Sequence, residues 1–154
     1  MATYTAVPPK VSDDFKTPTE VWANIQQYIP KDKKIWCPFY FNGDHTLKEL
    51  GYDIIHENKD FFTYVPECDI IVDNPPFSIK KQVLARLLEI DQPFILIMPC
   101  STLCYKYFQS YKDKIQLIVP PKRYNFAPQL KSSPSFDCLY FCYKMNLPRD
   151  LIFV

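Results

Sequence analysis

The chain has 154 residues, of which 47% are hydrophobic and 16% aromatic, so it can fold around a full core and is not expected to be disordered. Its net charge of +1 excludes a strong overall attraction to nucleic acid and confines any such contact to a local patch. Only two glycines, Gly43 and Gly51, are present, which excludes a glycine-rich phosphate loop for a dinucleotide or a nucleoside triphosphate.

The first half of the chain predicts elements in strand, helix, strand order after an N-terminal helix. Residues 1–12 show little periodicity and predict a flexible arm, whereas residues 13–154 predict a single domain. Thr17 is predicted to cap a helix that has Pro18 in its first turn, and Pro30 follows the end of that helix. The predicted elements are a helix over 19–28, a strand over 34–37, a helix over 45–50 and a strand over 52–56.

The second half continues the alternation. Its predicted elements are a strand over 68–73, a helix over 79–90, a strand over 93–98, a helix over 101–111, a strand over 115–119 and a last strand over 136–144. The segment 120–135 contains four prolines and is either a mobile substrate loop or a packed cover. About six strands alternating with helices indicate an α/β fold with an open, mainly parallel sheet and helices on both faces. Ligands of such a sheet collect beyond the carboxyl ends of its strands.

The six cysteines and the absence of a long apolar run indicate the cellular setting. No stretch approaches the roughly 20 apolar residues that cross a bilayer, and no signal peptide is recognisable, so we expect a soluble, intracellular protein without a membrane contact. Most of the cysteines lie in apolar or aromatic runs, and their Cys-x3-Cys pairs lack further zinc ligands nearby. We therefore expect free thiols in a reducing compartment and no metal site; the cysteines are Cys37, Cys68, Cys100, Cys104, Cys138 and Cys142.

The tetrapeptide Asn74-Pro75-Pro76-Phe77 directly follows the predicted strand over 68–73. Two consecutive prolines remove two N–H donors and end the strand. The Asn74 side chain and the Pro75 carbonyl are both hydrogen-bond acceptors for an amine, and the Phe77 ring offers a face for stacking. The pattern fits an exocyclic amine of a nucleobase, with an ordinary Asn-Pro turn as the alternative.

Acidic and aromatic residues follow the other predicted strands. Glu57 comes directly after the second strand, where a carboxylate is placed to hold ribose hydroxyls. Asp60 and Phe61 together offer a carboxylate for the edge of an adenine and a ring for its face. The alternatives are that Glu57 is a solvated loop acid and that Phe61 belongs to the core.

These motifs, in this order, resemble the class I S-adenosylmethionine-dependent methyltransferases, and in particular the phage and viral N6-adenine DNA methyltransferase-like group. The resemblance extends from about Asp13 to Tyr143. Cys37 stands where the family usually has an acidic residue, and Asp44 is the candidate to supply that charge. The matching pieces are Asp14-Phe15-Lys16-Thr17-Pro18, the loop from Pro38-Phe39 to Gly43, Glu57 with Asp60-Phe61, and Asn74-Pro75-Pro76-Phe77.

The resemblance implies a Rossmann-like fold whose last strand is antiparallel, and S-adenosylmethionine as cofactor. It implies catalysis at Asn74, Pro75, Pro76 and Phe77, where Asn74 and the Pro75 carbonyl polarise the N6 amine by accepting hydrogen bonds from it while its nitrogen attacks the methyl group. Phe77 would stack on the adenine after it leaves the duplex. The cofactor would lie among Thr17, Pro18, Pro38, Phe39, Gly43, Glu57, Asp60 and Phe61.

Nucleic acid, and DNA in particular, is the expected partner. Lys122 and Arg123 precede Tyr124 and Phe126, and basic residues interleaved with aromatic ones can follow a phosphate backbone; the alternative is a strand-to-loop junction with both rings buried. No separate target-recognition domain is predicted, so site selection rests on the segment 120–135 or on a partner subunit. A homodimer is a further expectation, because so small a domain has little surface with which to hold a duplex. The alternative functions are methylation of an RNA base or of protein glutamine, and a binding or assembly subunit that has lost catalysis.

Overall fold

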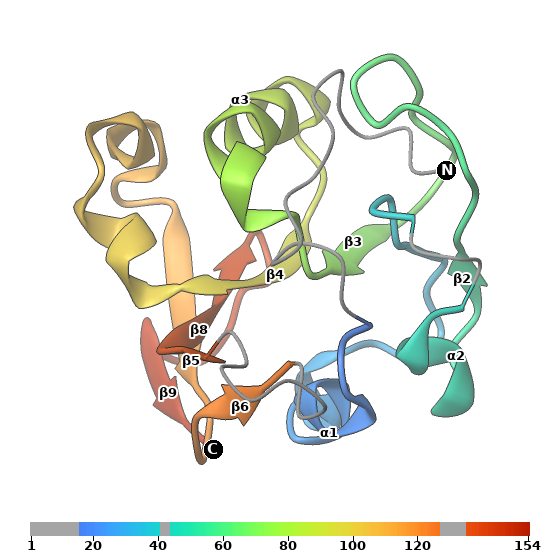
Figure 1. Cartoon of the computed structure of the whole chain (residues 1–154), viewed down its shortest axis with the longest axis horizontal. Coiled ribbons are helices and arrows are strands. Elements are labelled where there is room, and N and C mark those ends of the chain that lie inside the picture. Colours follow the sequence, from blue (N-terminus) through green and yellow to red (C-terminus); the bar gives the residue numbers. More distant parts are fainter. Residues whose placement is uncertain (1–15, 41–43, 127–134) are drawn as a thin grey trace.

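The structure, a computed structural model, describes residues 16–40, 44–126 and 135–154; the predicted N-terminal arm and Gly43 lie outside these ranges. A seven-stranded sheet in the order β2-β1-β3-β4-β8-β5-β9 forms its centre (Figure 1). The strands of this sheet are β1 (Ile35–Trp36), β2 (Ile54–Ile55), β3 (Ile70–Asp73), β4 (Phe94–Pro99), β5 (Ile115–Val119), β8 (Cys138–Tyr143) and β9 (Leu151–Phe153). A separate two-stranded sheet pairs β6 (Tyr124–Asn125) with β7 (Ser135–Phe136).

The sheet is parallel except for one strand. β8 runs antiparallel to both of its neighbours, β4 and β5, while the other pairs are parallel. The predicted α/β class and mainly parallel sheet are confirmed. The antiparallel strand is not the last one, however, because β9 follows it and pairs with β5 at the sheet edge. β9 has three residues, and the side chains of the first and the last are exposed. So short a strand gives no apolar pattern that can be recognised in the sequence.

Helices cover both faces of the sheet, as predicted (Figure 1). Ile95 and Ile97 of β4 pack with residues of α1 and α2, whereas Phe94, Leu96 and Met98 pack with residues of α3 and η5. Side chains on a strand alternate between the two faces, so a strand buried on both sides is a continuous apolar run. The helices are α1 (Thr19–Ala23), α2 (Thr46–Glu49), α3 (Lys80–Ile90) and the 3-10 helices η2 (Gln26–Tyr28), η3 (Phe77–Ile79), η4 (Cys100–Cys104) and η5 (Lys106–Tyr111).

Two predicted helices are wrong in detail. The helix expected over 19–28 is divided into α1 and η2, and Thr17 does not cap it, because the N-cap is Pro18 and has no side-chain cap bond. The Thr17 hydroxyl instead accepts a hydrogen bond from Asn74. The helix expected over 101–111 consists of η4 and η5, which are separated by Tyr105 in an extended conformation. In both cases apolar spacing identified the buried face without fixing the hydrogen-bond pattern.

The cysteines provide a simple test of this core. Cys100 and Cys104 are exposed, while Cys37, Cys138 and Cys142 are buried. Burial raises the pKa of Cys138 to about 12 and that of Cys142 to about 12, and it raises the pKa of Cys37 well above its usual value. Since only a thiolate is alkylated, iodoacetamide near pH 8 should modify Cys100 and Cys104 first, as mass spectrometry of the native protein would show. Early modification of Cys37 would contradict the described packing.

Candidate active site

The candidate site lies where the order of the sheet reverses. β1 has β2 on one side and β3 on the other, so the loops after β1 and β3 leave the sheet next to each other. Ligands of open α/β sheets bind in the crevice beyond the carboxyl ends at such a point. The loop after β1 contains Pro38 and Phe39, and the loop after β3 contains Asn74 to Phe77. The structure thus brings together two of the segments that the sequence singled out.

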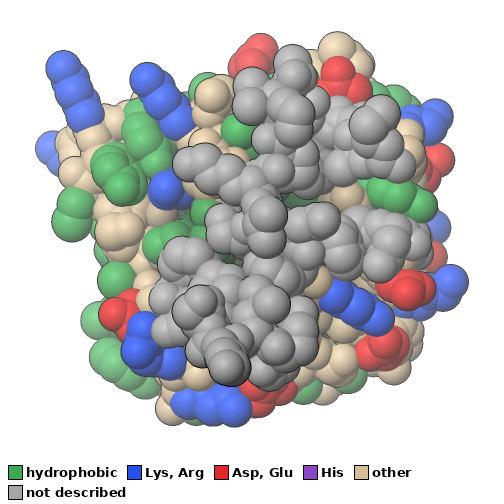
Figure 2. All heavy atoms as spheres, in the orientation of Figure 1, with side chains coloured by type: hydrophobic (Ala, Val, Ile, Leu, Met, Phe, Trp, Pro, Cys, Tyr) green, Lys and Arg blue, Asp and Glu red, His purple; other side chains and the backbone are tan. Residues whose placement is uncertain are grey.

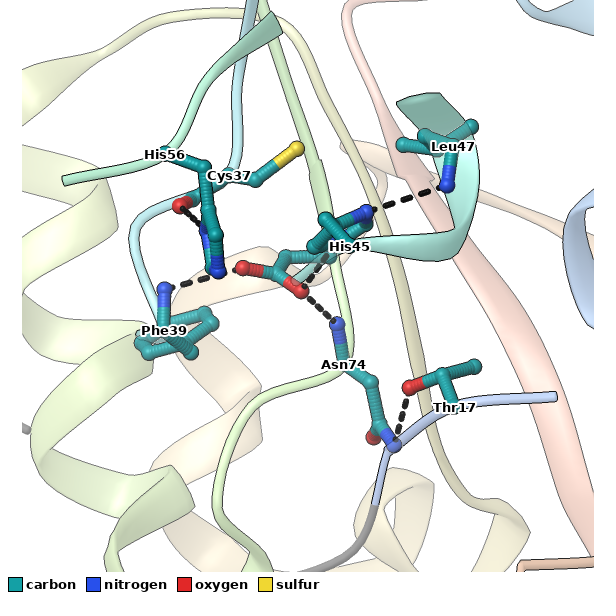
Figure 3. A network of polar contacts seen from close by, with 8 residues as sticks. Thr17, Cys37, Phe39, His45, Leu47, His56 and Asn74 are labelled. Carbon is teal, nitrogen blue, oxygen red and sulfur yellow. Dashed lines mark hydrogen bonds and ion pairs between the residues drawn. The ribbon is translucent and has the colours of Figure 1, made fainter. Parts of the chain in front are cut away.

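Asp73, the last residue of β3, is the centre of a buried hydrogen-bond network whose other members Phe39, His45 and Asn74 are labelled in Figure 3. Its side chain is almost fully buried, and its carboxylate accepts hydrogen bonds from the Phe39 backbone N–H at 2.9 Å and from the Asn74 backbone N–H at 2.8 Å. His45 Nε2 lies 3.0 Å from the same carboxylate. Because His45 Nδ1 accepts from the Leu47 backbone N–H, a neutral His45 carries its proton on Nε2 and donates it to Asp73.

This network connects the loop after β1, the start of α2 and the Asn74 turn. Neither Asp73 nor His45 was predicted as a site residue. A signal for Asp73 was present in the sequence, because an acidic residue inside a buried apolar strand needs several donors around it. Two of its partners, His45 and Phe39, are 28 and 34 positions away in the chain and could not be identified from spacing.

Among the described residues, the side-chain amide of Asn74 is held on one side and has an unsatisfied oxygen on the other. Its Nδ2 group donates to the Thr17 hydroxyl at 3.1 Å, which orients the side-chain amide (Figure 3). The carbonyl oxygen Oδ1 is buried and has no hydrogen-bond partner in the part of the chain that the structure describes. Pro75 and Pro76 are buried, and Phe77 is half-buried at the start of η3. The turn therefore holds an acceptor without a donor at the carboxyl edge of the sheet.

A second buried acceptor lies after β2. His56 Nδ1 donates to the Cys37 carbonyl at 2.8 Å, so the neutral ring has a lone pair on Nε2. Nε2 is buried and unpaired among the described residues. The His56 ring stacks on Tyr40 at 5.1 Å between centroids and meets the His45 ring edge-on at 5.0 Å. Sequence reasoning did not include His56.

The acidic residues predicted for the nucleoside lie after β2. Glu57 is exposed and accepts a hydrogen bond from the Tyr64 hydroxyl at 3.2 Å. Asp60 is half-buried, and its carboxylate accepts from the Phe62 backbone N–H at 2.9 Å. Phe61 is completely buried and packs against Trp36 and Phe39, so its ring has no open face in this conformation. Pro38 and Phe39 are also buried, and Pro18 is half-buried.

Lys122 and Arg123 are exposed and lie in ion pairs. Lys122 Nζ is 3.0 Å from a Glu20 carboxylate oxygen, and Arg123 Nε is 2.6 Å from Asp137. Tyr124 and Phe126 are buried, as the strand-to-loop alternative expected. The two cations are therefore partly neutralised by neighbouring acids, and binding to phosphate by this segment stays a prediction.

The described residues contain no cluster of three or more histidine, cysteine or acidic side chains that could hold a metal ion. None of their helices is long and apolar enough to cross a membrane.

Comparison with known proteins identifies the fold. No protein-family model and no curated protein matches the sequence. A provisionally named RNA methyltransferase from Pyrococcus horikoshii has a similar crystal structure, with a TM-score of 0.53, 13% sequence identity and 92% of each chain covered. The structure of precorrin 8W decarboxylase from Methanobacterium thermoautotrophicum covers 93% of this chain and 98% of its own at 12% identity, but its TM-score of 0.46 is too low to support a conclusion.

The chain thus has a Rossmann-like fold of the kind found in methyltransferases. Neither of these two structures is described as an N6-adenine enzyme, so the finer resemblance rests on the sequence motifs alone.

Proposed function

We propose that this protein transfers a methyl group from S-adenosylmethionine to an exocyclic amine, and that its acceptor is adenine N6 in DNA. The observation that carries the proposal is the buried, unpaired Oδ1 of Asn74 on the turn after β3. Leaving a buried acceptor unsatisfied costs about 1–3 kcal/mol, and an amine entering beside Asn74 would remove that cost. Catalytic sites are among the places where such unsatisfied groups occur.

The residues around the switch point fit the cofactor. When bound, S-adenosylmethionine supplies an electrophilic methyl group, and its ribose hydroxyls and amines are hydrogen-bond donors. The chain offers acceptors for them in His56 Nε2 and in the carboxylates of Glu57 and Asp60. Cys37 cannot supply the negative charge that the family usually has at its position, because burial raises its pKa and keeps the thiol neutral.

The chain's own contribution to the reaction is orientation and polarisation of the amine. Asn74 Oδ1 and the Pro75 carbonyl would accept hydrogen bonds from the two N–H groups of the amine, which orients its nitrogen and stabilises the positive charge that develops there. Thr17 holds the Asn74 amide, and Asp73 holds the backbone N–H of the same residue. These two contacts therefore hold Asn74 Oδ1, the hydrogen-bond acceptor, in position before the substrate binds.

RNA is the second candidate acceptor, because the similar Pyrococcus horikoshii structure is described as an RNA methyltransferase. Transfer of tritiated methyl groups to single-stranded DNA, duplex DNA and RNA of one sequence would separate the two, followed by nucleoside digestion and mass spectrometry. N6-methyladenine in DNA would support the proposal. Label in RNA alone would make RNA, instead of DNA, the methyl acceptor. Label in none of the three would favour protein glutamine as the acceptor, or a binding or assembly subunit without catalysis.

Cofactor binding gives an independent prediction. Asp60→Asn keeps an oxygen that can accept from the Phe62 N–H but removes the charge, so the loop should keep its shape. Isothermal titration with S-adenosylmethionine should show roughly tenfold weaker binding for Asp60→Asn, because a hydrogen bond to a charged group contributes about 1.5–3 kcal/mol. Equal affinity of both proteins would remove Asp60 from the cofactor site. If the wild type released no heat at millimolar ligand, the proposal that this chain binds the cofactor without a partner subunit would be overturned.

A further inference from the structure

The segment between β4 and β5 presents two stacked tyrosines at the surface. The ring centroids of Tyr105 and Tyr107 lie 5.3 Å apart and their planes differ by 10°. Tyr105 is 44% exposed, whereas Tyr107 is half-buried and packs against the core cluster on the α3 side of the sheet. A ring that is supported in this way loses little conformational freedom when a further flat group binds to it.

These tyrosines border the candidate active site. The Lys80 ammonium lies 5.0 Å from the centroid of the Tyr105 ring and 3.4 Å from the Phe77 carbonyl, to which it donates a hydrogen bond. Phe77 belongs to the turn that follows β3, and Tyr105 belongs to the segment that follows β4, the neighbouring strand. One lysine side chain thus connects the exposed ring with the turn that carries Asn74.

The same two segments are basic, although the whole chain is nearly neutral. Residues 74–88 and 99–112 contain no aspartate or glutamate. Among the described residues, none of their lysines forms an ion pair, in contrast to Lys122 and Arg123. In the upper left of Figure 2, over η4 and η5, hydrophobic side chains lie among Lys and Arg side chains with no acidic side chain between them. The lysines are Lys80, Lys81, Lys106 and Lys112.

We infer that the surface formed by Tyr105, Tyr107, Lys80 and Lys106, here called the tyrosine surface, binds single-stranded nucleic acid. An unpaired base would stack on Tyr105 while the lysines contact the flanking phosphates. Stacking platforms beside cations are typical of proteins that hold unpaired strands, and stacking contributes roughly 1–3 kcal/mol for each base. An acidic peptide would satisfy the lysines but would bring no flat group to stack on the exposed Tyr105 ring.

The inference rests on the proposed function only in placing the target base beside Asn74. Strand binding itself requires neither cofactor nor methyl transfer, so the two can fail separately. Binding without transfer would leave the tyrosine surface intact and count against the enzyme. Methyl transfer to protein glutamine without any nucleic-acid binding would count against the tyrosine surface and against DNA as the acceptor, but not against methyl transfer itself.

Fluorescence anisotropy of the full chain with a fluorescein-labelled oligodeoxythymidine of about 20 nucleotides tests the tyrosine surface. Tyr105→Ala should weaken binding by at least about fivefold, whereas Tyr105→Phe, which keeps the ring, should bind like the wild type. Lys106→Gln should lower the slope of log affinity against log salt by about one. Phe153→Ala is the matched control, because Phe153 is a 71% exposed aromatic residue on β9, and this variant should bind unchanged.

An abasic oligonucleotide of equal length supplies the decisive comparison, because it has the same phosphates and no bases. The wild type should bind it at least about fivefold more weakly than oligodeoxythymidine. Equal affinity for the two strands, or unchanged binding by a Tyr105→Ala protein with a wild-type thermal melt, would overturn the inference. Displacement of the strand by polyglutamate at equal charge would also overturn it, in favour of an acidic peptide ligand.

Discussion

Asp73→Ala is expected to lower the free energy of unfolding by about 3–5 kcal/mol, the cost of removing one partner from a buried charged network. The substitution leaves the Phe39 and Asn74 backbone N–H groups and the proton of His45 Nε2 without an acceptor. Since 1 kcal/mol corresponds to roughly 2–4 °C in a protein of this size, the melting temperature should fall by about 6–20 °C. Urea unfolding followed by circular dichroism measures the change directly.

Two further substitutions separate the network from a general effect of lost charge. Asp73→Asn preserves the shape and one acceptor oxygen, so it should cost less than Asp73→Ala. Asp53→Ala removes an exposed carboxylate that is paired with Lys34, and an exposed pair contributes roughly 0–1 kcal/mol. If Asp73→Ala were no more destabilising than Asp53→Ala, the network would not hold the Asn74 turn in place.

Asn74→Ala should reduce the rate of methyl transfer by about 10²–10³-fold, the effect typical of removing one preorganised hydrogen-bonding group from a reacting centre. It should leave the affinity for S-adenosylmethionine close to that of the wild type, because the predicted cofactor residues after β1 and β2 are unchanged. Single-turnover transfer to the acceptor found in the tritium assay gives the rate, and titration gives the affinity. A protein that binds the cofactor but hardly transfers its methyl group is the expected result.

The Asn74 prediction has its own controls. Asn74→Asp keeps a side-chain acceptor and should restore part of the rate lost in Asn74→Ala. Thr17→Val removes the group that accepts from Asn74 Nδ2 while keeping the shape of the side chain, so it should slow transfer less than Asn74→Ala does. Full activity of Asn74→Ala would exclude this turn as the catalytic centre and would direct attention to the other buried acceptor, His56 Nε2.

Sequence reasoning located the central strands and the main helix because their signals are local. Prolines bound the run that forms β4, two prolines end β3, and the apolar spacing of Val83, Leu84 and Leu87 marks the buried side of α3. The same signals misjudged 101–111, where the hydrogen-bond pattern is 3-10. Such short elements depend on packing and have little helical preference of their own.

The sequence by itself determined where β3 and β4 run and where β3 ends at the Asn74 turn, since covalent constraints at proline and side-chain burial act within a few residues. Only the tertiary structure decided which groups surround that turn. Thr17 lies 57 positions from Asn74 along the chain, and Phe39 and His45 lie 34 and 28 positions from Asp73. The order of strands in the sheet makes them neighbours, and no local pattern encodes that order. The same holds for Lys80, which connects the Asn74 turn with the ring of Tyr105.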